Sequence, residues 1–121
     1  MTKKIIGDQG EEIAALYLEQ QGYKILKKNY RIKGGELDII CKSSDDYIVF
    51  VEVKSFLYQF TYHPLCRISE KKKRLLIRTA THYLLVRQLE DVLIRFDVLV
   101  VNVGLRQVMH FYDAIHHNPA I

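Results

Sequence analysis

The chain has 121 residues, of which 49% are hydrophobic and 26% charged, and its formal net charge is +4. These values predict one soluble globular domain over residues 1–121, without repeats or low-complexity tracts. No apolar run has the length of a transmembrane helix or the pattern of a signal peptide, so a cytoplasmic protein is expected. A pI near 9.1 favours an anionic partner, nucleic acid above all. Cys41 and Cys66 lack metal-motif spacing and are expected to be reduced thiols.

The first predicted element is a helix over residues 8–21, with Asp8 as its N-cap and Gly22 as its stop. Its apolar stripe follows helical spacing and begins with a carboxylate: Glu11, Ala14, Ala15, Leu18. The small alanines predict a helix that lies close to a sheet. Glu11 then points along the sheet as a candidate site residue, or it is a first-turn carboxylate that balances the helix dipole. The pattern leaves both interpretations open.

Residues 23–31 predict an edge strand, because lysines recur along it. Two further strands, residues 34–40 and 48–54, are β-branched and apolar, and the polar turn at residues 43–46 joins them into a hairpin. Both faces of this hairpin are apolar along most of their length, which is typical of strands covered on both sides.

Charged residues gather at one end of this hairpin. Side chains alternate between faces along a strand, which places Glu36 and Asp38 on one face of the first strand and Glu52 and Lys54 on one face of the second. With the turn centred near residue 45, Asp38 lies opposite Glu52, and Glu36 lies opposite Lys54. Three carboxylates and an ammonium are costly to bury unless they are paired or bind a metal ion. The spacing fits a site for a hard cation, and it also fits a structural ladder of salt bridges.

Aromatic residues alternate in the segment 56–66, which ends near Pro64. Aromatic side chains beside a basic surface can stack on nucleic-acid bases. Packing within the domain or a subunit contact is the favoured interpretation, and a homodimer is therefore considered among the expected assemblies.

The second helix is predicted over residues 69–88, with Ser69 as its N-cap, and it holds most of the excess positive charge. At 100° per residue, Lys72 lies on the apolar stripe with Leu75 and Leu76. It is therefore expected to reach the charged end of the hairpin, although a snorkelling lysine would show the same pattern. The other basic residues are predicted to point outward, toward phosphates: Lys71, Lys73, Arg74, Arg78.

Two more strands complete the chain, over residues 92–102 and 105–112. Asp97 lies inside an apolar run, which predicts a buried partner of Arg95 or of a backbone group. His110, His116 and His117 have no coherent metal-ligand spacing, and the last two are expected in a frayed tail.

Taken together, the elements predict an α/β (α+β) domain in the order αβββαβ, with a mixed central sheet flanked by helices and one extra C-terminal strand. This order, with Gly-Glu-x-Asp on one strand and Glu-x-Lys on the next, resembles the PD-(D/E)XK nuclease superfamily of restriction-endonuclease-like fold. The chain is most similar to its small bacterial YraN-like family, which is related to archaeal Holliday-junction resolvases. The resemblance covers nearly the whole chain and rests on these segments: Gly7-x-x-Gly10-Glu11, Ala14-Ala15-x-Tyr17-Leu18, Gly22-Tyr23, Asn29-Tyr30, Gly35-Glu36-Leu37-Asp38-Ile39-Ile40, Val49-Phe50-Val51-Glu52-Val53-Lys54, Ile68-Ser69-x-x-Lys72, Ala80, Tyr83-Leu84 and Arg95-Phe96-Asp97-Val98.

The resemblance implies a nuclease that cleaves phosphodiester bonds in DNA, with branched DNA as one candidate substrate. It implies that Glu11, Asp38 and Glu52 hold Mg²⁺ or Mn²⁺, that Lys54 orients water or stabilises charge, and that Glu36 supports them or is an alternate ligand. Two departures affect substrate handling: Phe56 stands where the family usually has a basic residue, and Phe60-Thr61 where it tends to have glycine. The alternatives are a nucleic-acid-binding module without catalysis and a structural partner protein.

Overall fold

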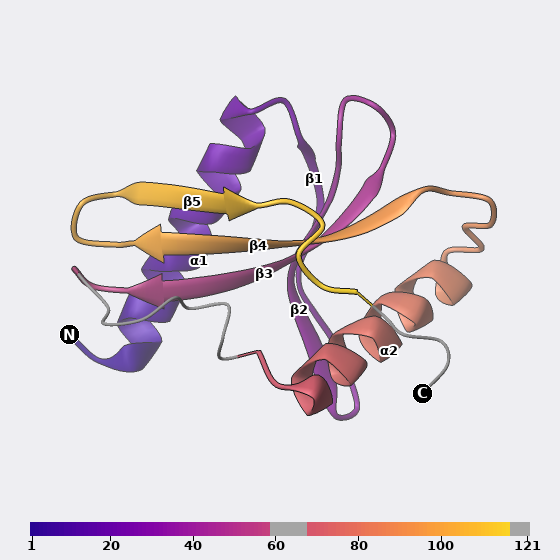
Figure 1. The fold of residues 1–121 in the computed structure, drawn as a ribbon, viewed down its shortest axis with the longest axis horizontal. Coiled ribbons are helices and arrows are strands. Elements are labelled where there is room, and N and C mark those ends of the chain that lie inside the picture. Colours follow the sequence, from indigo (N-terminus) through magenta and orange to yellow (C-terminus); the bar gives the residue numbers. More distant parts are fainter. Residues whose placement is uncertain (59–67, 117–121) are drawn as a thin grey trace.

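The computed structural model describes residues 1–58 and 68–116, which form one five-stranded sheet and two helices (Figure 1). The strands lie in the order β1-β2-β3-β4-β5, and only β3 and β4 pair in parallel. The predicted αβββαβ order with an added C-terminal strand is confirmed, and this is a restriction-endonuclease-like α+β fold. The elements are α1 (Lys3–Gln20), β1 (Lys24–Ile32), β2 (Gly35–Lys42), β3 (Ile48–Phe56), α2 (Glu70–Val86), β4 (Ile94–Asn102) and β5 (Gln107–Phe111).

The two helices cover opposite faces of the sheet, so that two hydrophobic cores form (Figure 1). Ala14, Ala15 and Leu18 of α1 pack on one face, and the small alanines let this helix lie close to β3. Leu76, Ala80 and Tyr83 of α2 pack on the other face. Covering both faces explains why the central strands are apolar on both sides.

The predicted start of the first helix is wrong. The helix begins at Lys3, and the side chain of Thr2 caps it by accepting a hydrogen bond from the backbone N–H of Ile5. Asp8 lies inside the helix, where its carboxylate pairs with Lys4 at 2.9 Å. Glu11 is therefore in the middle of α1 and not in its first turn. The helix dipole acts only on the first and last turns and does not account for Glu11.

The predicted register of the hairpin is confirmed where the strands pair, from Ile39 opposite Val51 to Lys42 opposite Ile48. Beyond Ile39 the ladder stops, because β2 continues beside β1 and leaves β3 (Figure 1). The prediction that Glu36 lies opposite Lys54 is therefore wrong. Position 38 is where the two strands separate.

Strict alternation of side chains along β2 also fails at this position. Leu37 packs in the α2-side core with Ile40, whereas Ile39 packs in the α1-side core. Asn29 of the neighbouring strand has a φ of 53°, and the β1–β2 register lacks a pair between Asn29 and Asp38. A residue in the left-handed region interrupts the pleat, so the faces of β2 exchange across Asp38.

Much of the predicted aromatic segment 56–66 lies outside the described residues, as do Cys66 and His117. Phe56 is half-buried against the α2-side core, and Tyr58 is exposed while its backbone carbonyl accepts a hydrogen bond from Asn102 at 2.6 Å. Of the two, Phe56 fits the packing interpretation. Across the two described ranges, neither helix has the length and apolar character needed to cross a bilayer.

Candidate active site

Two carboxyl groups meet where β2 leaves β3. Glu52 on β3 is 5% exposed, and its side chain is hydrogen-bonded to that of Asp38 on β2. Asp38 Oδ2 also accepts a hydrogen bond of 2.7 Å from the backbone N–H of Val53. Burial, followed by the contact with Glu52, raises the pKa of Asp38 well above its ordinary value. The pair therefore retains a proton that two solvent-exposed carboxyl groups would lose.

Two lysines neutralise this carboxyl pair. Lys72 Nζ on α2 lies 3.3 Å from Glu52 Oε2, and Lys54 Nζ on β3 lies 4.0 Å from the same oxygen. The first turn of α2 is fixed by Ser69, whose hydroxyl accepts a hydrogen bond from the backbone N–H of Lys72 at 3.1 Å. The prediction that the ammonium of Lys72 reaches a hairpin carboxylate is confirmed.

Glu11 and Glu36 add negative charge near the pair. Burial raises the pKa of Glu11, and the nearby charges of Glu36, Asp8 and Glu52 raise it further. Glu36 forms a salt bridge with Arg31, at 3.2 Å between Arg31 Nε and Glu36 Oε1. All four predicted acidic site residues therefore lie in one region, with Glu36 at its rim.

A glycine contact brings α1 against β3 at this point. A Cβ atom on Gly10 would lie 1.8 Å from Ser55 Oγ, which is closer than atoms can approach. Only glycine allows the helix backbone to lie this near the strand that carries Glu52. Because Glu11 follows Gly10 directly, this contact sets the distance of its carboxylate from the site.

Two cavities flank the cluster and differ in charge. A cavity of about 430 Å³ lies on the α1 side, and its lining includes the carboxylates of Asp8, Glu11, Glu12 and Asp38. The second cavity, of about 300 Å³, lies between the β1–β2 turn and α2, and Arg31 and Lys72 provide its positive charge.

The acidic side chains of the cluster have the chemical type of donor that a hard divalent cation prefers, but not yet the arrangement. In residues 1–58 and 68–116, no three Asp, Glu, His or Cys side chains lie so that they could together hold a metal ion. Glu11, Asp38 and Glu52 offer only carboxylate oxygens, the donors that Mg²⁺ and Mn²⁺ prefer. The proton held by Asp38 and the lysines paired with Glu52 balance charge that a cation would otherwise balance.

The basic residues of α2 do not form a uniform outward surface as predicted. Lys71 and Arg74 are exposed, and no ion-pair partner for either occurs among the described side chains. Lys73 is half-buried and pairs with Glu70 at 3.1 Å. Arg78 donates a hydrogen bond of 3.0 Å to the backbone carbonyl of Lys33. Among the described residues of this face of α2, Lys71 and Arg74 are therefore the cations most accessible to a ligand.

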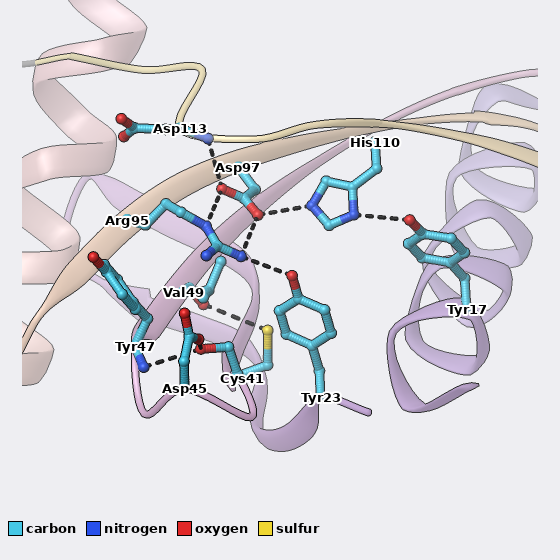
Figure 2. A network of polar contacts seen from close by, with 11 residues as sticks. Tyr17, Tyr23, Cys41, Asp45, Tyr47, Val49, Arg95, Asp97, His110 and Asp113 are labelled. Atoms are coloured by element: carbon cyan, nitrogen blue, oxygen red, sulfur yellow. Dashed lines mark hydrogen bonds and ion pairs between the residues drawn. The ribbon is translucent and has the colours of Figure 1, made fainter. Parts of the chain in front are cut away.

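A second polar network surrounds Asp97 on the α1 face of β4 (Figure 2). Its fully buried carboxylate accepts two hydrogen bonds from Arg95, at 2.9 and 3.1 Å, and one from the backbone N–H of Asp113 at 2.9 Å. His110 Nε2 lies 2.7 Å from Asp97 Oδ2, and His110 Nδ1 lies 2.9 Å from the hydroxyl of Tyr17. The prediction that Asp97 is a buried partner of Arg95 is confirmed.

The hydrogen bonds of this network stabilise the buried carboxylate of Asp97. Burial alone would raise the pKa of Asp97, but hydrogen bonds from His110 and Arg95 lower it below its ordinary value. Burial raises the pKa of Tyr17 to about 12, which keeps its hydroxyl protonated. The network ties α1 to β4 and β5. The role of His110 was missed from the sequence because its partner depends on the β4–β5 register, in which His110 pairs with Leu99.

Comparison with known proteins places the chain in one family. The model of the family described as "Uncharacterised protein family UPF0102" matches residues 10–101. A UPF0102 protein of Clostridioides difficile is 42% identical over 114 residues, which are 94% of this chain and 99% of that protein. A UPF0102 protein of Lachnoclostridium phytofermentans is 41% identical, over 94% of this chain and 98% of its own length. One of Chlorobium phaeobacteroides is 36% identical, over 91% of this chain and 92% of its own length. The chain therefore belongs to UPF0102, the YraN-like family that its motifs resemble.

Proposed function

We propose that the protein is a metal-dependent nuclease that cleaves phosphodiester bonds in DNA, with branched DNA among its candidate substrates. The observation that carries the proposal is the buried contact between Asp38 and Glu52, with Lys54 and Lys72 on the same carboxylate. Buried acids gathered with lysines beside a cavity have the composition of a candidate catalytic site. The motif resemblance to PD-(D/E)XK nucleases supports the same activity.

Each residue has a defined part in this proposal. Asp38, Glu52 and Glu11 hold Mg²⁺ or Mn²⁺, which supplies a bound water of lowered pKa and Lewis-acid stabilisation of the phosphate. Lys54 orients the attacking water and places positive charge beside the phosphate. Lys72 exchanges its partner, from the carboxylate of Glu52 to the phosphate.

The proposed cofactor is consistent with the charge state of the cluster. To hold the ion, Asp38 would have to give up its proton, since metal ligands must be deprotonated. Lys72 and Lys54, which pair with Glu52 in this structure, would then be available to the phosphate. Asp38 and Glu11 line the acidic cavity on the α1 side, and the basic side of the cluster remains for the phosphate.

The second candidate is a nucleic-acid-binding module of the same fold without catalysis. The observation that favours it is that Glu52 is already neutralised by Lys72 and Lys54. Against it stands the retention of Asp38 and Glu52, since buried acids close to a phosphate weaken binding and a module would gain from losing them.

The experiment is a cleavage screen with Mn²⁺ over linear, flapped and four-way DNA, with binding measured in EDTA on the same samples. Wild-type protein is expected to cleave at least one form, whereas Asp38→Asn and Glu52→Gln bind DNA without cleaving it. Binding without cleavage by the wild type would favour the non-catalytic module. Equal cleavage by the wild type and both variants would refute this site as the catalytic centre.

A further inference from the structure

The basic cavity beside the carboxyl cluster has the character of an anion-binding site. Ile32, Leu75 and Leu76 give it an apolar floor, and its charged lining consists of Arg31 and Lys72 with one acid, Glu36. Lys72 connects the cavity directly to the candidate active site, since its ammonium also contacts Glu52. An anion in this cavity therefore lies immediately beside the carboxyl pair.

The wall of the cavity formed by the β1–β2 turn is held in place by α2. The guanidinium of Arg78 donates to the backbone carbonyl of Lys33, which fixes the turn on the helix. Gly34 has a φ of 82°, a conformation that favours glycine. A Cβ on Gly35 would lie 2.2 Å from Thr79 Oγ1, so only glycine lets the turn pack this closely. The cavity is therefore preformed.

Arg31 is the cation of this wall that is most accessible to a ligand. Its side chain is 71% exposed, and its partner Glu36 is 40% exposed at the same rim. Exposed ion pairs of this kind contribute little to stability, so exchange of the partner costs little. The planar guanidinium carries donors in a fork that matches two oxygens of a phosphate. Its charge also reaches the cluster, where it lowers the pKa of Glu11 against the larger effect of burial.

We propose that this cavity is a subsite for a backbone phosphate next to the one that is cleaved, and that Arg31 holds it after leaving Glu36. The nucleic-acid ligand of this inference rests on the proposed function. Asp38 and Glu11, which would help to hold the metal ion, line the acidic cavity, whereas the subsite phosphate occupies the basic cavity. The role of Arg31 is positioning, because it fixes the strand and does not touch the reacting atoms.

The test measures binding of a short DNA duplex in EDTA, so that no step depends on metal or cleavage. Arg31→Gln is expected to weaken binding roughly five- to tenfold and to lower the salt slope by about 0.9, the value for one lost phosphate contact. Glu36→Gln is expected to tighten binding, because Arg31 no longer has a competing partner. Arg31 is exposed, and neither substitution removes a core side chain.

Arg106→Gln is the matched control. Arg106 is an exposed arginine in the turn between β4 and β5, at the far edge of the sheet from β1. It should leave affinity and slope unchanged. The subsite is overturned if Arg31→Gln behaves like Arg106→Gln, or if the wild-type protein binds no DNA at any salt. Failure of the proposed catalysis is a separate outcome: the wild type binds DNA through Arg31 but does not cleave it with Mn²⁺.

Discussion

The carboxyl groups of Asp38 and Glu52 are hydrogen-bonded to each other at the position where β2 separates from β3. Paired strands would hold these two side chains in a regular ladder. Because β2 and β3 separate here, the two carboxyl groups contact each other directly. Here Asp38 reaches across the opening and also accepts from the backbone N–H of Val53. A buried pair of acids in this arrangement is costly unless a proton or a cationic group balances its charge.

Asp38→Asn is therefore expected to stabilise the metal-free protein at neutral and higher pH. The pKa of Asp38 is raised above its value in the unfolded chain, so the folded protein retains a proton that the unfolded chain loses. The free energy of unfolding thus falls as the pH rises from the unfolded pKa through the folded one. The amide of the variant does not titrate, and its oxygen can still accept from the backbone N–H of Val53. Urea denaturation in EDTA between about pH 4 and pH 9 should show a flatter pH dependence for the variant, with a gain on the order of 1–3 kcal/mol at the upper end.

The wild type and Asp38→Asn also test whether a divalent cation binds at Asp38. Mn²⁺ should raise the melting temperature of the wild type, because a ligand of the native state stabilises it by mass action. It should not raise that of Asp38→Asn, which has lost one donor. Equal stabilisation of both proteins would mean that the ion binds elsewhere.

Lys72→Met tests two expected effects of the contact with Glu52: it stabilises the buried carboxylate, and it competes with a metal ion for that carboxylate. The substitution keeps the apolar stem that packs on α2 and removes the charge. Glu52 is almost fully buried and retains only Lys54, so we expect a loss of about 1–2 kcal/mol in the metal-free protein. Metal affinity should rise because a competing cation is gone, while DNA cleavage should fall. Calorimetry with Mn²⁺ measures the first effect, and an unchanged affinity would show that Lys72 does not control the carboxylate.

The basic face of α2 should bind phosphate through particular residues and not through its total charge. Lys71 and Arg74 are exposed, whereas Lys73 is paired with Glu70. The double variant Lys71→Gln, Arg74→Gln should lower the salt slope of duplex binding by about 1.8, which is 0.9 for each contact. Lys73→Gln is the control, with a smaller expected change. Equal effects of all three substitutions per charge would indicate long-range attraction only.

The contacts within elements and between paired strands were predictable from the sequence, because they follow from regular geometry. Helical angles placed Lys72 beside the hairpin, and turn position gave the register that pairs Ile39 with Val51. The fork at Asp38 was not predictable by these rules, which assume a continuous pleat. Its visible cause is the positive φ of Asn29 on the neighbouring strand. Most non-glycine residues in a strand have a negative φ, so there was no reason in the sequence to expect this conformation.

The helix start was mispredicted for a related reason. Asp8 has a side chain typical of an N-cap, with Glu11 and Glu12 then in the first turn, which favoured a start at Asp8. The helix nevertheless begins at Lys3, because Thr2 caps it and tertiary packing of α1 outweighs local propensity. The partners of Asp97 show the same limit, since His110 reaches it only through the pairing of β4 with β5.

Asp97→Asn should destabilise the protein strongly and change its response to acid. Its lowered pKa contributes stability above the unfolded pKa, and this contribution is lost as the pH falls through the folded one. The variant leaves Arg95 and His110 without a carboxylate in a buried site, at an expected cost of about 2–4 kcal/mol near pH 7. Its stability should also fall less steeply in acid than that of the wild type.

Asp113→Asn provides the control for this prediction. Asp113 contributes its backbone N–H to Asp97, and its own side chain is exposed and points away from the network (Figure 2). Urea denaturation should find it within about 0.5 kcal/mol of the wild type, as for most surface substitutions. A similar loss in both variants would show that the turn, and not the buried charge, sets the stability.

Gly10→Ala should move Glu11 away from the cluster and impair the site without removing any charged group. The new Cβ meets Ser55 Oγ at 1.8 Å and Ser55 Cβ at 2.6 Å, so α1 has to shift away from β3. We expect a loss of about 1–3 kcal/mol from this overpacking, together with weaker Mn²⁺ binding.

Gly7→Ala is the matched control in the same helix, because open space surrounds its new Cβ. It should stabilise the protein by about 0.5–1 kcal/mol, since alanine favours the helix interior. The double variant Gly10→Ala, Ser55→Gly removes the clashing side chain, and it should recover Mn²⁺ affinity even if some stability remains lost. If Gly10→Ala binds Mn²⁺ as tightly as Gly7→Ala does, the position of α1 does not control the site, and Glu11 is not a metal ligand.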